Sequence, residues 1–150
     1  MSEHTITPEE KILCDLAHKL VDQVALYGLA KDIAEEPQIV TAIQRAKDSR
    51  ANLLQEINAK IWLMGIPAID QGTKLGGANK SFLRLRAVVG KDNRSAIEEV
   101  ERGEDYLRNR VDKATHDERL TAHTRNYLQT VLSRVVTTHD EIKNLQSSIQ

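Results

Sequence analysis

Apolar residues recur at intervals of three or four along nearly the whole chain, which is the spacing of helices that bury one face. Thr7-Pro8-Glu9-Glu10 is typical of a helix start, because Thr caps the first turn, Pro suits the first helical position and acids complement the helix dipole. We expect this first helix to run to about Ala34, before a break at Glu36-Pro37. Its stripe consists of Leu13, Leu16, Leu20, Gln23, Tyr27 and Ala30.

A second stripe predicts a helix that ends at Gly65-Ile66-Pro67. Its members are Ile43, Ala46, Arg50, Leu54, Ile57, Ile61 and Met64. Residues 65–80 are rich in Gly and Pro, so they predict one long connection that crosses the length of a bundle. The amphipathic segment Phe82 to Val89 predicts a short extra helix before Gly90.

Asp92 or Asn93 is the expected cap of the third long helix. Thr115-His116-Asp117-Glu118 has the Ser/Thr-x-x-Glu form of a capping box, so we expect the fourth long helix to begin there. The third stripe is Ile97, Val100, Glu104, Leu107, Val111 and Ala114, and the fourth is Leu120, Leu128, Val131, Leu132, Val135, His139, Ile142 and Leu145. Two helical hairpins joined by a long connection predict an all-α antiparallel four-helix bundle, forming a single domain over residues 1–150.

Composition narrows the protein classes. A formal net charge of −1 provides no overall field that would recruit nucleic acid or an anionic membrane. The single cysteine, Cys14, excludes an intrachain disulfide and a cysteine-based zinc site. The amino terminus has no apolar run after a basic region, and no apolar stretch approaches the ~20 residues that span a bilayer. We therefore expect a cytoplasmic protein.

The histidines allow a complete search for the di-iron motif of helical bundles, which requires two Glu-x-x-His pairs. No Glu-x-x-His exists in the chain, and Asp15-x-x-His18 comes nearest to it. Phosphate-loop, nucleophile-elbow and His-Glu-x-x-His motifs are also absent. We expect no cofactor and no enzymatic activity.

Four polar residues interrupt the apolar stripes: Gln23, Arg50, Glu104 and His139. A buried charge costs several kcal/mol unless it is paired, so we expect Arg50 to pair with Asp22 or with Glu104 in a structural network. Folding the last hairpin about residue 115 predicts that His139 lies well away from Glu104. The alternative to a structural network is a ligand site.

Two further features have structural and functional interpretations. Gly28 and Gly103 interrupt helices, which indicates close approach of a neighbouring helix or, less simply, of a ligand. The basic stretch that includes Lys80, Arg84 and Arg86 is expected to be a solvated face that pairs with acids. A weaker hypothesis for this stretch is phosphate or nucleotide binding.

The run Glu101-Arg102-Gly103-Glu104-Asp105 resembles a bacterial family of ferritin-like four-helix bundles that is known only as a domain of unknown function. The Gly65-Ile66-Pro67 helix end, the Gly-rich connection, Phe82 to Arg86 and His139-Asp140 extend the resemblance over nearly the whole chain. The resemblance implies ferritin-like topology and a bacterial source, and it implies no activity.

We therefore expect a non-enzymatic interaction or stress-associated structural protein that forms a homodimer or another homo-oligomer. The alternative is a ferritin-like protein with a non-standard metal or small-ligand site. Fe, Mn or Zn would suit such a site, because carboxylates and imidazole bind these metals. The candidate site residues are Arg50, Glu101, Glu104, His139 and Asp140.

Overall fold

The structure, a computed structural model, describes residues 6–73 and 80–148. Within these ranges the chain forms five helices and no strand, which confirms the all-α prediction. The helices are α1 (Pro8–Ile33), α2 (Pro37–Leu63), α3 (Lys80–Arg86), α4 (Asn93–Thr115) and α5 (Ala122–Ser148). Crossing a bilayer takes a length and hydropathy that none of these five helices combines.

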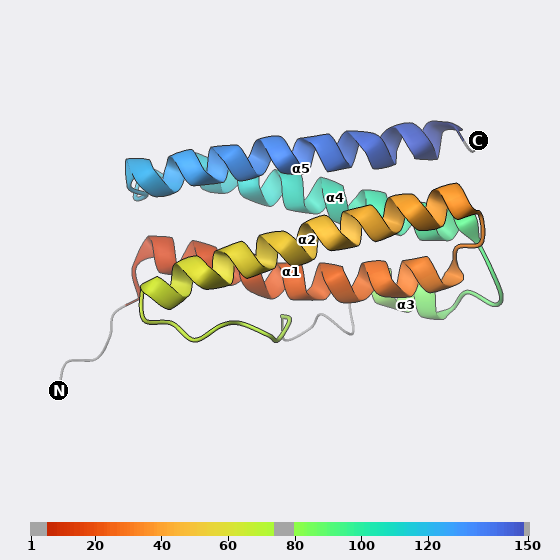
Figure 1. The fold of residues 1–150 in the computed structure, drawn as a ribbon, viewed down its shortest axis with the longest axis horizontal. Coiled ribbons are helices and arrows are strands. Elements are labelled where there is room, and N and C mark those ends of the chain that lie inside the picture. Colours follow the sequence, from red (N-terminus) through yellow and green to blue (C-terminus); the bar gives the residue numbers. More distant parts are fainter. Residues whose placement is uncertain (1–5, 74–79, 149–150) are drawn as a thin grey trace.

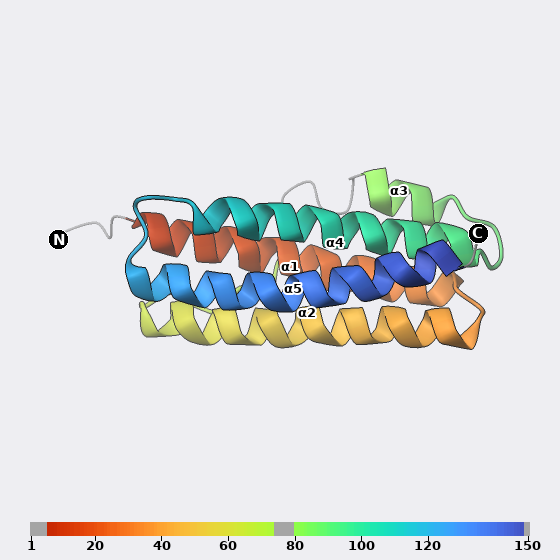
Figure 2. The same ribbon diagram turned by 90° about the horizontal axis from the view of Figure 1, so that it is seen from above.

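The four long helices lie side by side as a helical bundle (Figure 1). α1 and α2 form one antiparallel hairpin and α4 and α5 form another, and α4 packs beside α1 (Figure 2). Aliphatic residues fill the interior in two clusters. Leu20, Leu53 and Leu107 belong to one cluster, and Ala30, Ile43 and Val100 belong to the other. The polar residues of the stripes lie between these clusters in sequence.

Two of the predicted helix starts are confirmed by their capping hydrogen bonds. The Thr7 hydroxyl accepts from the backbone N–H of Glu10 at 3.1 Å, and the Asp92 carboxylate accepts from that of Ser95 at 3.0 Å. Each cap satisfies one of the backbone N–H groups that a helix leaves unpaired at its first turn.

The predicted start of the fourth long helix is wrong. Thr115 is still helical as the last residue of α4, where its hydroxyl donates to the carbonyl of Asp112 at 2.6 Å, so it is not the N-cap of the following helix. α5 begins at Ala122 instead, where the Thr121 hydroxyl accepts from the N–H of Thr124 at 3.3 Å. The loop of residues 116–121 therefore belongs to neither helix.

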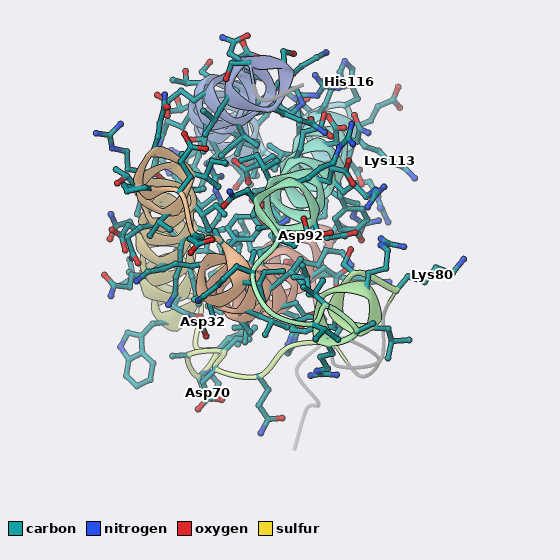
Figure 3. All side chains as sticks on the ribbon, turned by 90° about the vertical axis from the view of Figure 1, so that its right-hand side faces the viewer. Asp32, Asp70, Lys80, Asp92, Lys113 and His116 are labelled. Atoms are coloured by element: carbon teal, nitrogen blue, oxygen red, sulfur yellow. The ribbon has the colours of Figure 1, made fainter. Side chains whose placement is uncertain are left out.

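Figure 3 views the end of the bundle where Asp32 and Asp92 lie. The Asn93 side-chain oxygen accepts from the backbone N–H groups of Glu35 and Glu36, at 2.8 and 3.0 Å. The first residue of α4 thus provides the acceptor for two backbone N–H groups of the turn between α1 and α2. This contact ties the start of the second hairpin to the turn of the first.

The connection after α2 is held to both helices of the first hairpin (Figure 1). Asn58 of α2 bonds the backbone N–H and carbonyl of Ile69, at 2.8 and 3.0 Å. Asp22 of α1 accepts from the backbone and hydroxyl of Thr73, at 3.1 and 2.7 Å. The described part of the connection therefore runs beside α1 as far as Thr73.

The short helix α3 occupies residues 80–86, a little earlier than the predicted segment 82–89. Its apolar face consists of Phe82 and Leu85, both buried. Because α3 contacts α1 and α4, it covers the seam between the two hairpins.

Gly103 permits a close contact between α1 and α4. A Cβ added at Gly103 would lie 2.8 Å from the Tyr27 hydroxyl oxygen and 3.0 Å from a ring carbon. Tyr27 is fully buried, so its ring cannot move away freely. At Gly28, by contrast, the nearest atom would be the mobile Lys47 ammonium at 3.4 Å. The expectation of close approach is confirmed at Gly103, whereas at Gly28 only a flexible side chain is near.

The two glycines make a matched stability test. We expect Gly103→Ala to destabilise the protein by about 1–3 kcal/mol, because overpacking against Tyr27 outweighs the ~1 kcal/mol gain in helix propensity. Gly28→Ala should instead be neutral or stabilising by up to about 1 kcal/mol. Urea unfolding followed by circular dichroism measures both. A Gly103→Ala variant as stable as Gly28→Ala would contradict the close-contact interpretation.

Candidate functional site

A buried polar network joins three helices at the middle of the bundle. Arg50 of α2 forms an ion pair with Glu104 of α4, with 3.4 Å between guanidinium nitrogen and carboxylate oxygen. These side chains are only 2% and 0% exposed. The other Glu104 oxygen accepts from the Tyr27 hydroxyl of α1 at 2.6 Å. Of the two predicted pairings of Arg50, the one with Glu104 is therefore confirmed, whereas Asp22 bonds Thr73 instead.

Burial dominates the electrostatics of this network. It raises the pKa of Glu104, although Arg50 and the Tyr27 hydroxyl act in the opposite direction. Burial also raises the pKa of Tyr27 well above its ordinary value, and the neighbouring Glu104 adds to that shift. Tyr27 is thus a neutral hydrogen-bond donor throughout the physiological range. Arg50 supplies the positive charge that Glu104 needs in its ionised form.

Three buried atoms around the network have no hydrogen-bond partner among the described residues: Gln23 Oε1, Arg50 Nε and Glu104 Oε1. The last of these faces Arg50 at ion-pair distance, which is longer than an ordinary hydrogen bond. Arg50 also lines a cavity of about 450 Å³ between α2 and α5. The ion pair therefore balances the charges of Arg50 and Glu104, but the hydrogen bonding around it is incomplete among the described residues.

A second polar cluster lies where α4 faces α5. The buried His139 ring is bracketed by two carboxylates, because its Nε2 bonds Asp105 and its Nδ1 lies 3.1 Å from Asp140. Glu101 stands one helical turn before Asp105 on the same face of α4. One ligand atom each from Glu101, Asp105 and His139 lies within 4.8 Å of the others.

Burial, and then the neighbouring Asp105, raise the pKa of Glu101, whereas His139 and Lys143 lower it. Two carboxylates this close repel each other, and a cation between them relieves that repulsion. Two carboxylates and an imidazole are also a donor set that first-row divalent metals accept. The cluster can therefore hold a proton, an internal ion pair or a metal ion.

The structure brings the five candidate residues into two neighbouring groups. Arg50 and Glu104 lie in the buried network, and Glu101, His139 and Asp140 lie in the second cluster. The prediction that His139 lies well away from Glu104 is wrong, because His139 bonds the residue that follows Glu104. The reason is the 116–121 loop, which moves the fold-back point of the hairpin beyond residue 115.

Asp105 was not among the predicted site residues. The sequence feature that could have identified Asp105 is its i, i+4 spacing from Glu101, which places both carboxylates on one helix face. That spacing is common on solvated helices and became informative only with His139 beside it.

The basic stretch is used largely within the fold. Arg84 of α3 and Arg102 of α4 both bond the carboxylate of Glu99, which is buried. The Arg86 guanidinium lies 5.2 Å from the centre of the Phe82 ring. The prediction that this stretch pairs with acids is confirmed at Arg84.

A family model described as a domain of unknown function, DUF2383, matches residues 9–117. The chain belongs to the DUF2383 family. This confirms the predicted resemblance at the level of an uncharacterised domain family. Curated proteins and solved structures contain no match to the chain. The DUF2383 match ends just after α4, so it includes Arg50, Glu101, Glu104 and Asp105, whereas His139 follows it on α5.

Removing one partner of the buried ion pair should be strongly destabilising. We expect Arg50→Met to cost about 3–5 kcal/mol, because it leaves the Glu104 carboxylate buried without a cation. The double variant Arg50→Met, Glu104→Gln should recover much of this loss, since the remaining amide can still accept from Tyr27. Chemical denaturation of the three proteins measures the effect.

Arg45→Met is the matched control, because Arg45 is an exposed arginine of the same helix. It should change the free energy of unfolding by no more than about 0.5 kcal/mol. Equal stability of Arg50→Met and Arg45→Met would show that the pair does not hold the bundle together.

Proposed function

We propose that this DUF2383 domain is a metal-binding helical bundle that holds one divalent first-row metal ion between α4 and α5. The observation that carries the proposal is the His139 ring bracketed by Asp105 and Asp140, with Glu101 beside it. Metal-bound histidines commonly direct one ring nitrogen at the metal and the other at a carboxylate, which orients the ring.

In this proposal Glu101, Asp105 and His139 Nε2 are the ligands, and Asp140 orients the imidazole through Nδ1. A metal at about 2.0–2.2 Å from each ligand holds the ligand atoms at most about 4.4 Å apart. The spacing of the three groups, all within 4.8 Å, is close to that limit. Mn, Fe and Zn fit the mixed oxygen and nitrogen donors.

We further propose that the bundle is ferritin-like in topology. Support comes from its two antiparallel hairpins and from the connection after α2, which runs beside α1 as far as Thr73 (Figure 1). Di-metal sites in bundles of this kind lie in the core. In this bundle the cation in the core is the Arg50 guanidinium. The proposed metal ion lies beside the core, between α4 and α5.

The metal proposal is tested by equilibrium dialysis of the full chain against Mn²⁺, Fe²⁺ and Zn²⁺, with elemental analysis of the bound metal. We expect one ion per chain for at least one of these metals. Asp105→Asn and His139→Asn should abolish this stoichiometry because each removes a ligand. Asp140→Asn should weaken binding by about 10- to 100-fold, because it removes only the group that orients His139.

Asp112→Asn and His123→Asn are the matched controls, since both residues are exposed on the same two helices. They should bind metal as the unmodified protein does. Absence of stoichiometric binding, or equal loss in the control variants, would refute the metal site and leave the cluster as an ion pair.

A second function, self-association, is favoured by exposed apolar side chains at one end of the bundle. Trp62 and Leu63 end α2 with 67% and 87% of their surface exposed, and Ile6 precedes α1 at the same end (Figure 1). A Trp side chain alone can bury roughly 150–250 Å² in a contact. We propose that a second copy of the chain covers this end and forms a homodimer.

Light scattering of the eluting protein tests self-association. The full chain should elute as a dimer, and the double variant Trp62→Gln, Leu63→Gln should elute as a monomer. Val89→Gln should leave the dimer intact, because Val89 is also apolar and 96% exposed, and it belongs to the loop between α3 and α4, which lies at the other end of the bundle from the end of α2 (Figure 1). A monomeric full chain, or a Val89→Gln variant that dissociates like the double variant, would exclude this interface.

A further inference from the structure

A second site lies on the opposite side of α4 from His139. α1, α4, α3 and Thr73 of the connection border a half-open cavity of about 370 Å³. Among the described residues, those that matter for binding are Lys19, Gln23, Leu26, Phe82, Arg102 and Tyr106. This volume is within the range of roughly 300–1,000 Å³ that is typical of small-molecule sites.

A buried amide forms part of this cavity. The Gln23 side-chain nitrogen donates to the Gly103 carbonyl at 2.8 Å, which fixes the orientation of the amide. Its oxygen finds no hydrogen-bond partner among the described residues, although Gln23 is only 6% exposed. An unpaired buried acceptor is unfavourable, so the site favours a ligand that carries a hydrogen-bond donor.

The other residues that line the cavity are apolar in its interior and basic at its edge. Leu26, Phe82 and Tyr106 provide aliphatic and aromatic surface that suits a flat hydrophobic group. The Lys19 ammonium lies 5.4 Å from the centre of the Tyr106 ring and forms no ion pair with a described residue. The half-exposed Arg102 adds a second cation.

Two acids lie near these cations, and each of them also has another hydrogen-bond partner. Asp22 accepts from the backbone and hydroxyl of Thr73, and Glu99, which bonds Arg102, also bonds Arg84. Because Arg102 and Arg84 share the single carboxylate of Glu99 and Lys19 has no ion pair with a described residue, the edge of the cavity carries positive charge that an anionic group can balance. The buried amide offers an acceptor to a hydrogen-bond donor.

From these features we propose that the cavity binds a small aromatic carboxylate that also carries a hydroxyl group. Its ring lies against Phe82 and Tyr106, its carboxylate faces Lys19 and Arg102, and its hydroxyl donates to Gln23 Oε1. This site shares no residue with the proposed metal cluster. The two proposals can therefore fail independently.

The probe for this site is 6-hydroxy-2-naphthoate, whose fluorescence reports binding to the full chain. We compare it with 2-naphthoate, which lacks the hydroxyl, and 2-naphthol, which lacks the carboxylate. Saturable binding of the probe is expected, with affinity about fivefold weaker without the hydroxyl and about tenfold weaker without the carboxylate. Amide NMR shifts should move at Thr73 and Gly103, which border the cavity.

Two arginine variants of α4 locate the carboxylate. Arg102→Gln should raise the Kd of 6-hydroxy-2-naphthoate by about tenfold, because it removes one of the two cations. Arg94→Gln is the matched control: Arg94 is also an exposed arginine of α4 in an ion pair, but it lies outside the cavity, and its change should leave Kd within about twofold.

Circular dichroism checks that both variants remain folded. The proposal is overturned if the probe shows no saturable binding, if Arg102→Gln and Arg94→Gln weaken it equally, or if the NMR shifts map away from Thr73 and Gly103. Loss of metal binding with intact probe binding would reject only the metal proposal.

Discussion

The ion pair between Arg50 and Glu104 is the interaction on which the arrangement of the helices depends. Both charges lie in the core, where an unpaired charge costs several kcal/mol, so α2 and α4 must meet at the level that brings the two together. Tyr27 also fixes the position of α1 along the bundle axis, since its hydroxyl donates to the same carboxylate. Aliphatic packing alone tolerates a shift of one turn along a stripe, and this network does not.

Three successive residues of α4 belong to three different sites of the protein. Successive helical residues point about 100° apart, so Gly103, Glu104 and Asp105 face three different directions. Gly103 faces α1 and leaves room for Tyr27, Glu104 faces the core, and Asp105 faces His139 on α5. The cavity, the buried network and the carboxylate–histidine cluster are thus neighbours that share a backbone segment.

Local chemistry made the fold predictable, and the candidate site was predictable only in part. Residue type and helical spacing predicted the cap at Thr7, and they limited the cap of α4 to Asp92 or Asn93 and the partner of Arg50 to Asp22 or Glu104. The structure selects Asp92 and Glu104. The level of His139 could not be predicted in this way, because it depends on the length of the loop before α5. The cavity beside Gln23 was also beyond the sequence, since it requires the connection and α3 to return to the first hairpin.

Charge balance explains why the core and its edge can have different roles. A core carboxylate in a helical bundle needs a cation, and Arg50 provides one that is covalently part of the chain. An arginine cannot dissociate as a bound ion can, so Glu104 has a cation beside it whenever its carboxylate is ionised. At the edge, Glu101 and Asp105 face each other beside the imidazole of His139, and burial already raises the pKa of Glu101. Of the two clusters, the one at the edge is therefore where an exchangeable cation gains most.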